Sequence, residues 1–213
     1  MKLSHVQHLY NRVGFGITPK NLARLSKKSK INVVNELFDS SKKISVLNVD
    51  TSFLKGKTYK DFKSKERRKE LQKINKKKVS EFSIAWFLRL NNPSEILREK
   101  MTLFWTNHFV CKSKNIVFTE SYNNMLRENA LGDFRSFTKK VSKEAAMLVY
   151  LNNKQNNKKS PNENFARELM ELFTLGQDQY TEQDIKESAR AFTGYGHRFK
   201  GEFNFKQKND LKK

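Results

Sequence analysis

The chain has 213 residues, and its 43 lysines and arginines against 22 aspartates and glutamates give a formal net charge of +21. This length is typical of one domain with a sizeable core. Hydrophobic residues make up only 37%, but 17 phenylalanines and two tryptophans supply bulky core side chains. A single cysteine excludes an internal disulfide framework. No apolar run approaches the roughly 20 residues that cross a bilayer.

The start of the chain predicts three short helices. Residues 4–10 form the first, which ends where the glycines of residues 14–16 allow unusual backbone angles. Thr18 followed by Pro19 is typical of a capped helix start. Residues 31–38 place valine, leucine and phenylalanine at helical spacing and predict the third.

The most basic segment follows. Residues 55–78 carry 12 lysines and arginines against three acids and few apolar positions, which indicates a solvated helix or a mobile segment. The apolar block 82–90 predicts a buried helix. Ser94 is expected to cap the next helix, over residues 95–109.

The second half of the chain predicts further short helices. They cover residues 119–131, 134–141 with Asp133 as cap, 145–151, 161–175, and 182–192 with Thr181 as cap. Residues 152–159 are asparagine, lysine and glutamine with nothing to bury, and predict a surface loop. The phenylalanines of residues 198–205 are typical of a short strand or of an irregular tail.

Together these patterns predict an all-α fold, a compact multi-helix domain of about eight or nine helices with short loops. We expect residues 1–195 to form a single helical domain, with residues 55–80 as a basic helical or mobile segment within it. Residues 196–213 are expected to form an irregular basic tail.

The segment S-P-N-E-N-F-A-R-E-L-M-E-L-F-T-L-G, residues 160–176, has the start and stop signals of a complete helix. Ser160 is a natural N-cap, Pro161 suits the first helical position, and Glu163 completes a capping box. Gly176 supplies the left-handed residue that ends a helix.

The polar face of this helix is the best candidate for a functional site. Asn164, Arg167, Glu168 and Glu171 occupy neighbouring turns. Two carboxylates three residues apart can act as an acid–base pair or share a metal when they are partly buried. The alternative is a surface ladder of ion pairs, which is common on helices rich in glutamate and arginine.

Histidines are scarce, and their spacing matches no zinc-binding pattern. His108 follows Asn107 on an apolar helix, so its imidazole can serve as a base, or as a hydrogen-bonded core residue. The sequence contains no phosphate-binding loop and no other nucleotide motif. It names no metal and no cofactor.

The positive charge itself implies attraction to an anionic polymer or to an acidic partner protein. Residues 55–78 supply phosphate attraction without a helix-turn-helix or an aromatic RNA-binding signature, so such binding would be nonspecific and salt-dependent. The alternative is a lysine-rich coding bias that has placed lysines on solvated faces.

Several segments together resemble the bacterial family catalogued as domain of unknown function 1800. They are H-L-Y-N-R-V-G-F-G-I-T-P (residues 8–19), L-R-E-K-M-T-L-F-W-T-N-H-F (97–109), L-R-E-N-A-L-G-D-F (126–134), M-L-V-Y-L-N (147–152), the helix of residues 161–176, Y-T-E-Q-D (180–184) and A-R-A-F-T-G (189–194). They span nearly the whole chain in the order of the family, whose activity is not established.

This resemblance carries three further expectations. Relatives are longer, so the chain looks like the N-terminal half of such a protein, and a C-terminal half is missing. Without a signal peptide the chain is expected to be cytoplasmic, although some relatives are exported. The resemblance also lends weight to a polar pocket, with His108, Arg167, Glu168 and Glu171 as catalytic candidates and His8, Arg12, Asn107, Asn162 and Asn164 as ligand-binding candidates.

Three hypotheses follow from the sequence. In the first, these nine residues converge between helices in a catalytic or ligand-binding pocket, where His108 approaches Glu168. In the second, a non-enzymatic helical module binds an anionic polymer or a partner protein through its basic surface. In the third, the polar cluster is an internal network that only fixes the orientation of the helices.

Overall fold

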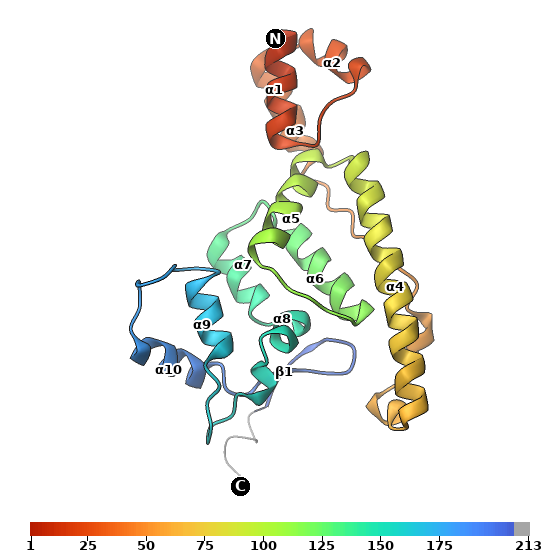
Figure 1. The fold of residues 1–213 in the computed structure, drawn as a ribbon. Coiled ribbons are helices and arrows are strands. Elements are labelled where there is room, and N and C mark those ends of the chain that lie inside the picture. The colour runs from red at the N-terminus through yellow and green to blue at the C-terminus, as the bar shows by residue number, and fades with distance from the viewer. Residues whose placement is uncertain (207–213) are drawn as a thin grey trace.

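The computed structural model describes residues 1–206 (Figure 1). This part of the chain contains ten α-helices, three short 3₁₀ helices and one antiparallel two-stranded sheet. The α-helices are α1 (Leu3–Val13), α2 (Pro19–Ser26), α3 (Lys30–Ser40), α4 (Lys65–Asn91), α5 (Ile96–His108), α6 (Ile116–Asn129), α7 (Phe134–Val141), α8 (Ala145–Tyr150), α9 (Asn164–Glu171) and α10 (Glu182–Ala191). The 3₁₀ helices are η1 (Ser52–Leu54), η2 (Tyr59–Phe62) and η3 (Asn153–Gln155), and the strands are β1 (Tyr195–His197) and β2 (Phe203–Phe205). The all-α prediction is confirmed.

Helices α1, α2 and α3 lie together at one end of the molecule and share a small core of their own (Figure 1). That core is built from Val6, Tyr10, Leu25, Val33 and Leu37. The predicted Thr18 cap is confirmed, since its hydroxyl accepts the N–H of Asn21. Gly16 has φ +106°, as expected for a turn that only glycine adopts without strain.

The basic segment is a helix for most of its length. Helix α4 begins at Lys65 after the cap Ser64, and residues 71, 74, 75, 78, 79 and 82 face the rest of the molecule at helical spacing. Asn75 anchors it, because its Oδ1 accepts the N–H of Ile116 at the start of α6 and its Nδ2 donates to Leu71 O.

The prediction of a buried helix over residues 82–90 is wrong in part. Phe82 is buried, but Ile84, Phe87 and Leu88 have exposed fractions of 58%, 63% and 62%. They lie on the side of α4 that faces away from α6. The apolar composition of this block therefore did not reveal that one of its faces is solvent-exposed.

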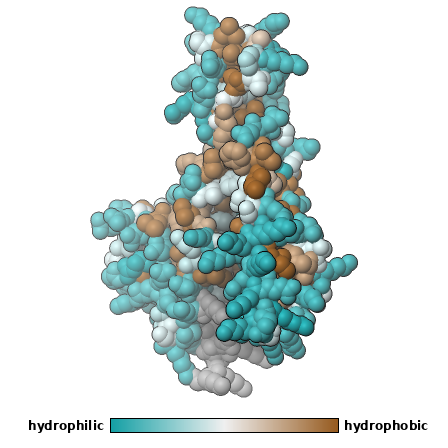
Figure 2. Space-filling view, turned by 45° about the vertical axis from the view of Figure 1, so that its right-hand side comes forward, coloured by the Kyte–Doolittle hydropathy of each residue, from teal (hydrophilic) through white to brown (hydrophobic). Residues whose placement is uncertain are grey.

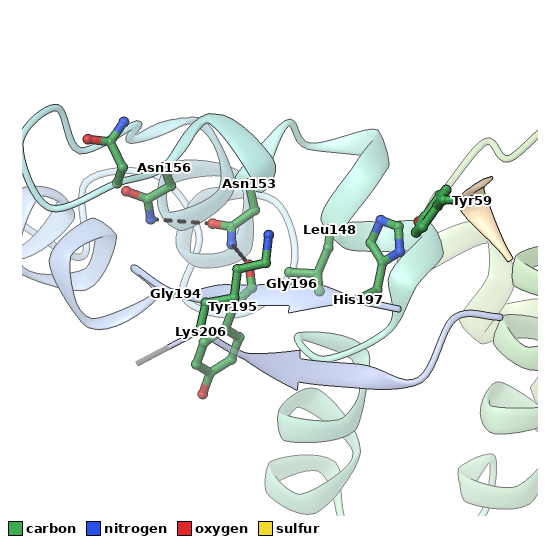
Figure 3. Close-up of a pocket in the computed structure, with 10 residues that line it drawn as sticks. Tyr59, Leu148, Asn153, Asn156, Gly194, Tyr195, Gly196, His197 and Lys206 are labelled. Atoms are coloured by element: carbon green, nitrogen blue, oxygen red, sulfur yellow. Dashed lines mark hydrogen bonds between the residues drawn. The ribbon is translucent and has the colours of Figure 1, made fainter. Parts of the chain in front are cut away.

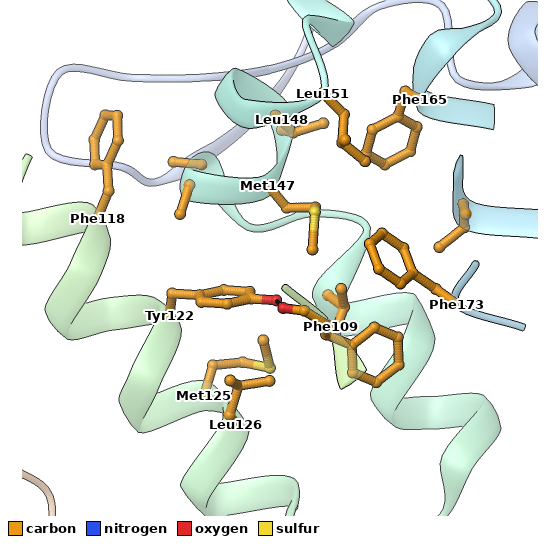
Figure 4. Packing of buried hydrophobic residues seen from close by; sticks show 14 of the residues in the cluster. Phe109, Phe118, Tyr122, Met125, Leu126, Met147, Leu148, Leu151, Phe165 and Phe173 are labelled. Atoms are coloured by element: carbon orange, nitrogen blue, oxygen red, sulfur yellow. Dashed lines mark hydrogen bonds between the residues drawn. The ribbon is translucent and has the colours of Figure 1, made fainter. Parts of the chain in front are cut away.

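The main core lies among α5, α6, α7, α8 and α9 (Figure 4). Figure 4 shows Tyr122 reaching from α6 toward Phe109, where its hydroxyl donates to the Phe109 carbonyl oxygen at 2.6 Å. Met147 of α8, together with Phe165 and Phe173 from the region of α9, closes the core on the other side. Aromatic packing among these helices therefore fixes where α9 lies.

A buried ion pair joins α5 to α6. Glu99 and Arg127 are both 0% exposed, and Arg127 Nε donates to Glu99 Oε1 at 2.6 Å. Trp86 of α4 donates its indole N–H to the other oxygen of Glu99 at 3.1 Å. Arg98 donates to the backbone carbonyls of Ser41 and Arg127. These contacts fix three helices and the loop after α3 relative to one another.

Two predicted helix starts need correction. Ser94 does not cap α5: its hydroxyl donates to the side chain of Glu95, which occupies the cap position. Helix α6 begins at Ile116 rather than at residue 119, because the side chain of Asn115 accepts the N–H of Val117. The cap predicted at Asp133 is confirmed, since it accepts the N–H of Ser136.

The end of the described chain is a hairpin rather than an irregular tail. Strands β1 and β2 pair in antiparallel register, with Tyr195 opposite Phe205 and His197 opposite Phe203. The strand alternative considered for the phenylalanine-rich segment is therefore the one observed. The predicted tail continues through residues 207–213, which lie outside the described residues.

Candidate functional site

The polar helix α9 begins later than its capping signals predict. Ser160 is not its N-cap, and the predicted capping box with Glu163 does not form. Asn157 Oδ1 accepts the backbone N–H of Ser160. This hydrogen bond closes a turn that places Ser160 before the start of the helix. Asn162 instead accepts the N–H of Asn164. The predicted stop at Gly176 is also wrong: α9 ends at Glu171, five residues earlier, although Gly176 does adopt the left-handed backbone, with φ +89°.

Arg167 ties α9 to α10 at the surface. Its guanidinium donates to both carboxylate oxygens of Glu182, at 2.8 and 2.7 Å, and to Glu163 at 3.0 Å. The hydrogen bonds with Glu182, and then with Glu163, raise the pKa of Arg167. Both carboxylates are partly or largely solvent-exposed, so the arrangement is a surface clamp between two helices.

The other polar residues of α9 also have structural partners or face solvent. Tyr180 donates its hydroxyl to Glu171 at 2.8 Å, and this bond, followed by one from Gln177, lowers the pKa of the Glu171 carboxyl. Asn164 Nδ2 donates to the carbonyl oxygen of Leu151. Glu168 is half-buried, and none of the side chains that the structure describes hydrogen-bonds to its carboxylate.

His108 is the last residue of α5, and its side chain lies close to the C-terminal end of α9. Its Nε2 is 2.9 Å from the carbonyl oxygen of Phe173, and since a carbonyl can only accept, Nε2 carries the proton. The ring packs among aromatic side chains, with Phe109 at a centroid distance of 4.7 Å and Trp105 at 5.7 Å. No hydrogen bond within the described part of the chain joins His108 to Glu168, and the neighbouring Asn107 is exposed.

His8 and Arg12 lie elsewhere. Both are exposed on α1, at the opposite end of the molecule from α9 (Figure 1). The nine candidate residues therefore occupy three places: α1, the end of α5, and α9 with the loop before it, where Asn162 lies. A catalytic role for His108, Arg167, Glu168 or Glu171 stays a prediction from the sequence.

The basic segment, residues 55–78, has a simpler geometry. Of its 12 lysines and arginines, 11 are exposed and Lys78 alone is half-buried. Lys78 is also the only one whose side chain lies within 4 Å of a carboxylate of residues 1–206, pairing with Glu81 and Asp50. Figure 2 brings the α4 side of the molecule forward and shows hydrophilic residues over much of the lower part of that face. The structure therefore concentrates exposed positive charge on η2, its flanking loops and the first half of α4.

A pocket of about 350 Å³ adjoins this segment (Figure 3). Tyr59 of η2 lines it on one side, together with His197 of β1. Two buried asparagines line the other side. Asn153 donates to the carbonyl oxygens of Phe192 and Tyr195, and Asn156 donates to that of Ala189. The remaining lining residues are Leu148, Asn157, Gly194, Gly196 and Lys206.

The sequence reasoning missed both the buried ion pair and this pocket. Arg98, Glu99 and Arg127 stand in ordinary helical sequence, where charged residues usually face water, so no local pattern marks them as buried. Tyr59 and His197 are 138 positions apart. The only signal for the pocket was the phenylalanine-rich segment at residues 198–205, whose Phe199 packs against Tyr59.

Comparison with known proteins identifies the chain at the level of the family. The family described as "Protein of unknown function (DUF1800)" matches residues 8–212. The chain belongs to this family. No curated protein and no solved structure matches it.

Within the described part of this DUF1800 protein, the segments that carried the resemblance mainly make structural contacts. The segments 97–109 and 126–134 supply both partners of the Glu99–Arg127 pair. The segments 147–152 and 189–194 border the asparagines beside the pocket, since Asn156 donates to the Ala189 carbonyl. In residues 1–206, no group of three or more His, Cys, Asp or Glu side chains could hold a metal ion. No helix in that range is long and apolar enough to cross a membrane.

Proposed function

We propose that this DUF1800 protein binds an anionic polymer through the basic segment, residues 55–78. The observation that supports it is the exposure of 11 of its 12 basic side chains, with no carboxylate partner for those 11 in residues 1–206. The segment holds a net charge of +9, from 12 basic and three acidic residues, of the +21 of the whole chain. Each bound phosphate or sulfate releases counterions from the polymer, which drives association.

Local geometry supports an extended contact. Successive turns of α4 place Lys65, Lys69 and Lys73 about 6 Å apart along the helix axis. Lysine side chains reach several ångströms from the helix and rotate freely, so they meet a charged backbone without requiring one fixed spacing. The expected binding is therefore weakly specific and strongly dependent on salt.

Fluorescence anisotropy with a labelled 20-nucleotide oligodeoxythymidylate and with labelled heparin tests the proposal, from 50 to 400 mM salt. The variant Lys69→Gln, Lys73→Gln, Lys76→Gln, Lys77→Gln removes four charges from exposed positions of the basic segment. A matched control removes the same charge from exposed lysines elsewhere, as Lys20→Gln, Lys27→Gln, Lys30→Gln, Lys43→Gln.

We expect affinity to fall steeply with salt, with a slope of log K against log salt of about −0.7 per phosphate contacted for a single strand. The basic-segment variant should bind at least about tenfold more weakly at low salt and show a shallower slope, whereas the control should stay within about threefold. Equal losses in both variants, or binding that is independent of salt, would overturn the proposal.

A further inference from the structure

Tyr59 places the pocket at the edge of the basic segment. The residue belongs to η2, between Lys57 and Lys63, and also lines the pocket. Tyr59 is 58% exposed as a residue, and its ring is held on one side by Phe199, at a centroid distance of 4.9 Å in an edge-to-face arrangement. Phe62 stacks on the same Phe199 at 5.6 Å. An exposed ring with a fixed support is the geometry of a stacking platform.

The asparagine side of the pocket is preorganised. Asn153 and Asn156 are 1% and 6% exposed, and Asn156 Nδ2 donates to Asn153 Oδ1 as well as to the Ala189 carbonyl. Asn156 Oδ1 accepts the N–H of Asn162. Because these amides are already bonded to the protein, they hold the shape of the wall and need no ligand to order them.

Two other groups at the pocket keep hydrogen-bonding capacity that no group described in the structure takes up. His197 Nδ1 lies 2.9 Å from the carbonyl oxygen of Arg198, so Nδ1 carries the proton and Nε2 of the neutral ring remains an acceptor. Lys206 Nζ is a cation in the same lining. The pocket thus offers aromatic faces, one acceptor and one cation.

We infer that the pocket takes one unstacked base of a single-stranded nucleic acid whose phosphates lie along residues 55–78, an inference that rests on the proposed function. A flat base stacks on Tyr59, its polar edge meets His197, and its own phosphate lies near Lys206. The volume of about 350 Å³ is at the small end of ligand pockets, about 300–1,000 Å³. This suits a single base and its sugar.

Other polyanions satisfy only part of the arrangement. A duplex keeps its bases stacked and paired, so none enters the pocket without the cost of flipping. A sulfated polysaccharide matches the basic segment but offers no flat π-system to Tyr59. Duplex DNA and heparin are therefore the comparison ligands.

Two pocket variants test the inference. Tyr59→Leu removes the stacking ring. Gly196→Val adds a side chain whose Cβ meets only ordinary contacts, 3.5 Å from Asn204 O and from Lys206 Cε, so the fold should tolerate it while the pocket narrows. Tyr59→Phe keeps the ring. Tyr150→Leu is the matched control, an exposed tyrosine outside the pocket that undergoes the same substitution. Thermal unfolding of each variant confirms that it is folded.

In anisotropy titrations of the full chain, we expect Tyr59→Leu and Gly196→Val to bind oligodeoxythymidylate about fivefold or more weakly, while Tyr59→Phe and Tyr150→Leu stay within about twofold. Heparin affinity should not change in any of the four variants. If both pocket variants bind the single strand as the unsubstituted protein does, the inference is overturned while the proposed function stands. If neither polymer binds, the proposed function fails first.

Discussion

Removing the negative charge of Glu99 should destabilise the protein strongly. In the native structure the Glu99 carboxylate accepts from Arg127 Nε at 2.6 Å, from Arg127 Nη2 at 3.3 Å and from Trp86 Nε1 at 3.1 Å. Neither partner of the ion pair is exposed to solvent. Glu99→Gln keeps the shape of the side chain but turns an amide toward the guanidinium and leaves Arg127 buried without a counter-charge.

The expected loss of stability depends on which hydrogen bonds Arg127 keeps in the variant. Breaking a buried ion pair by removing one partner costs about 3–5 kcal/mol, because the remaining charge is uncompensated. In Glu99→Gln the guanidinium still donates to Asn124 Oδ1, at 2.7 Å, and the new amide oxygen can accept one hydrogen bond. We therefore expect the lower end of this range, a loss of about 3 kcal/mol in the free energy of unfolding. Most native domains are stable by only about 5–15 kcal/mol.

Urea unfolding followed by tryptophan fluorescence and by far-ultraviolet circular dichroism measures this loss. Glu187→Gln is the control, since Glu187 pairs with Arg190 on the surface with 52% and 67% of the side chains exposed, and its effect should stay within about 0.5 kcal/mol. A double substitution, Glu99→Leu with Arg127→Met, should recover part of the loss because it removes both charges together. A loss below about 1 kcal/mol in Glu99→Gln would refute the reasoning.

Three pH-linked predictions follow from other carboxyl and thiol groups. Hydrogen bonds from Arg24 and then Lys28 lower the pKa of Glu36, so its stabilisation is present above the ordinary value of 4.5 and is lost as pH falls through the lowered one. Glu36→Gln should therefore be less stable at neutral pH and lose stability less steeply below about pH 4.5 in urea titrations. Burial raises the pKa of the Glu144 carboxyl, so its ionisation opposes folding above pH 4.5. The variant Glu144→Gln should therefore gain stability relative to the unsubstituted protein as the pH rises through that region. Burial, and then the charge of Glu144, raise the pKa of the Cys111 thiol from 9.0 to about 12. At pH 8 its alkylation by iodoacetamide should therefore be slower in the folded protein than in urea, by on the order of a thousandfold. Equal rates in the two conditions would contradict this prediction.

Helix starts could be predicted where the cap acts only on its own helix. Thr18, Asp133 and Thr181 each accept a backbone N–H in the following turn, as their sequence context indicates. Ser160 had the same signature but failed, because Asn157 three residues earlier formed a turn with it first. A capping signal is therefore reliable only when no neighbouring asparagine competes for the same backbone group.

The buried charges could not be predicted for a different reason. Burial of Glu99 depends on Arg127, which is 28 positions away, and on Trp86 in a third helix. Local periodicity shows which face of a helix is apolar, but it does not show which charged side chain finds a partner across the interface. The same limit explains why the pocket was missed, because Tyr59 and His197 come together only when the hairpin of β1 and β2 packs against η2.

The basic half of α4 shows how the fold and the proposed binding depend on each other. Lys65, Lys69, Lys73 and Lys77 follow one another at i, i+4 spacing, and each such like-charge pair destabilises a helix by about 0.2–0.5 kcal/mol. The Ser64 cap, the Asn75 anchor to α6 and the apolar stripe offset this repulsion. An anionic polymer on this face removes the repulsion that the free protein carries. Part of the proposed binding free energy then comes from reduced repulsion between the lysines, so binding also stabilises the helical conformation of α4.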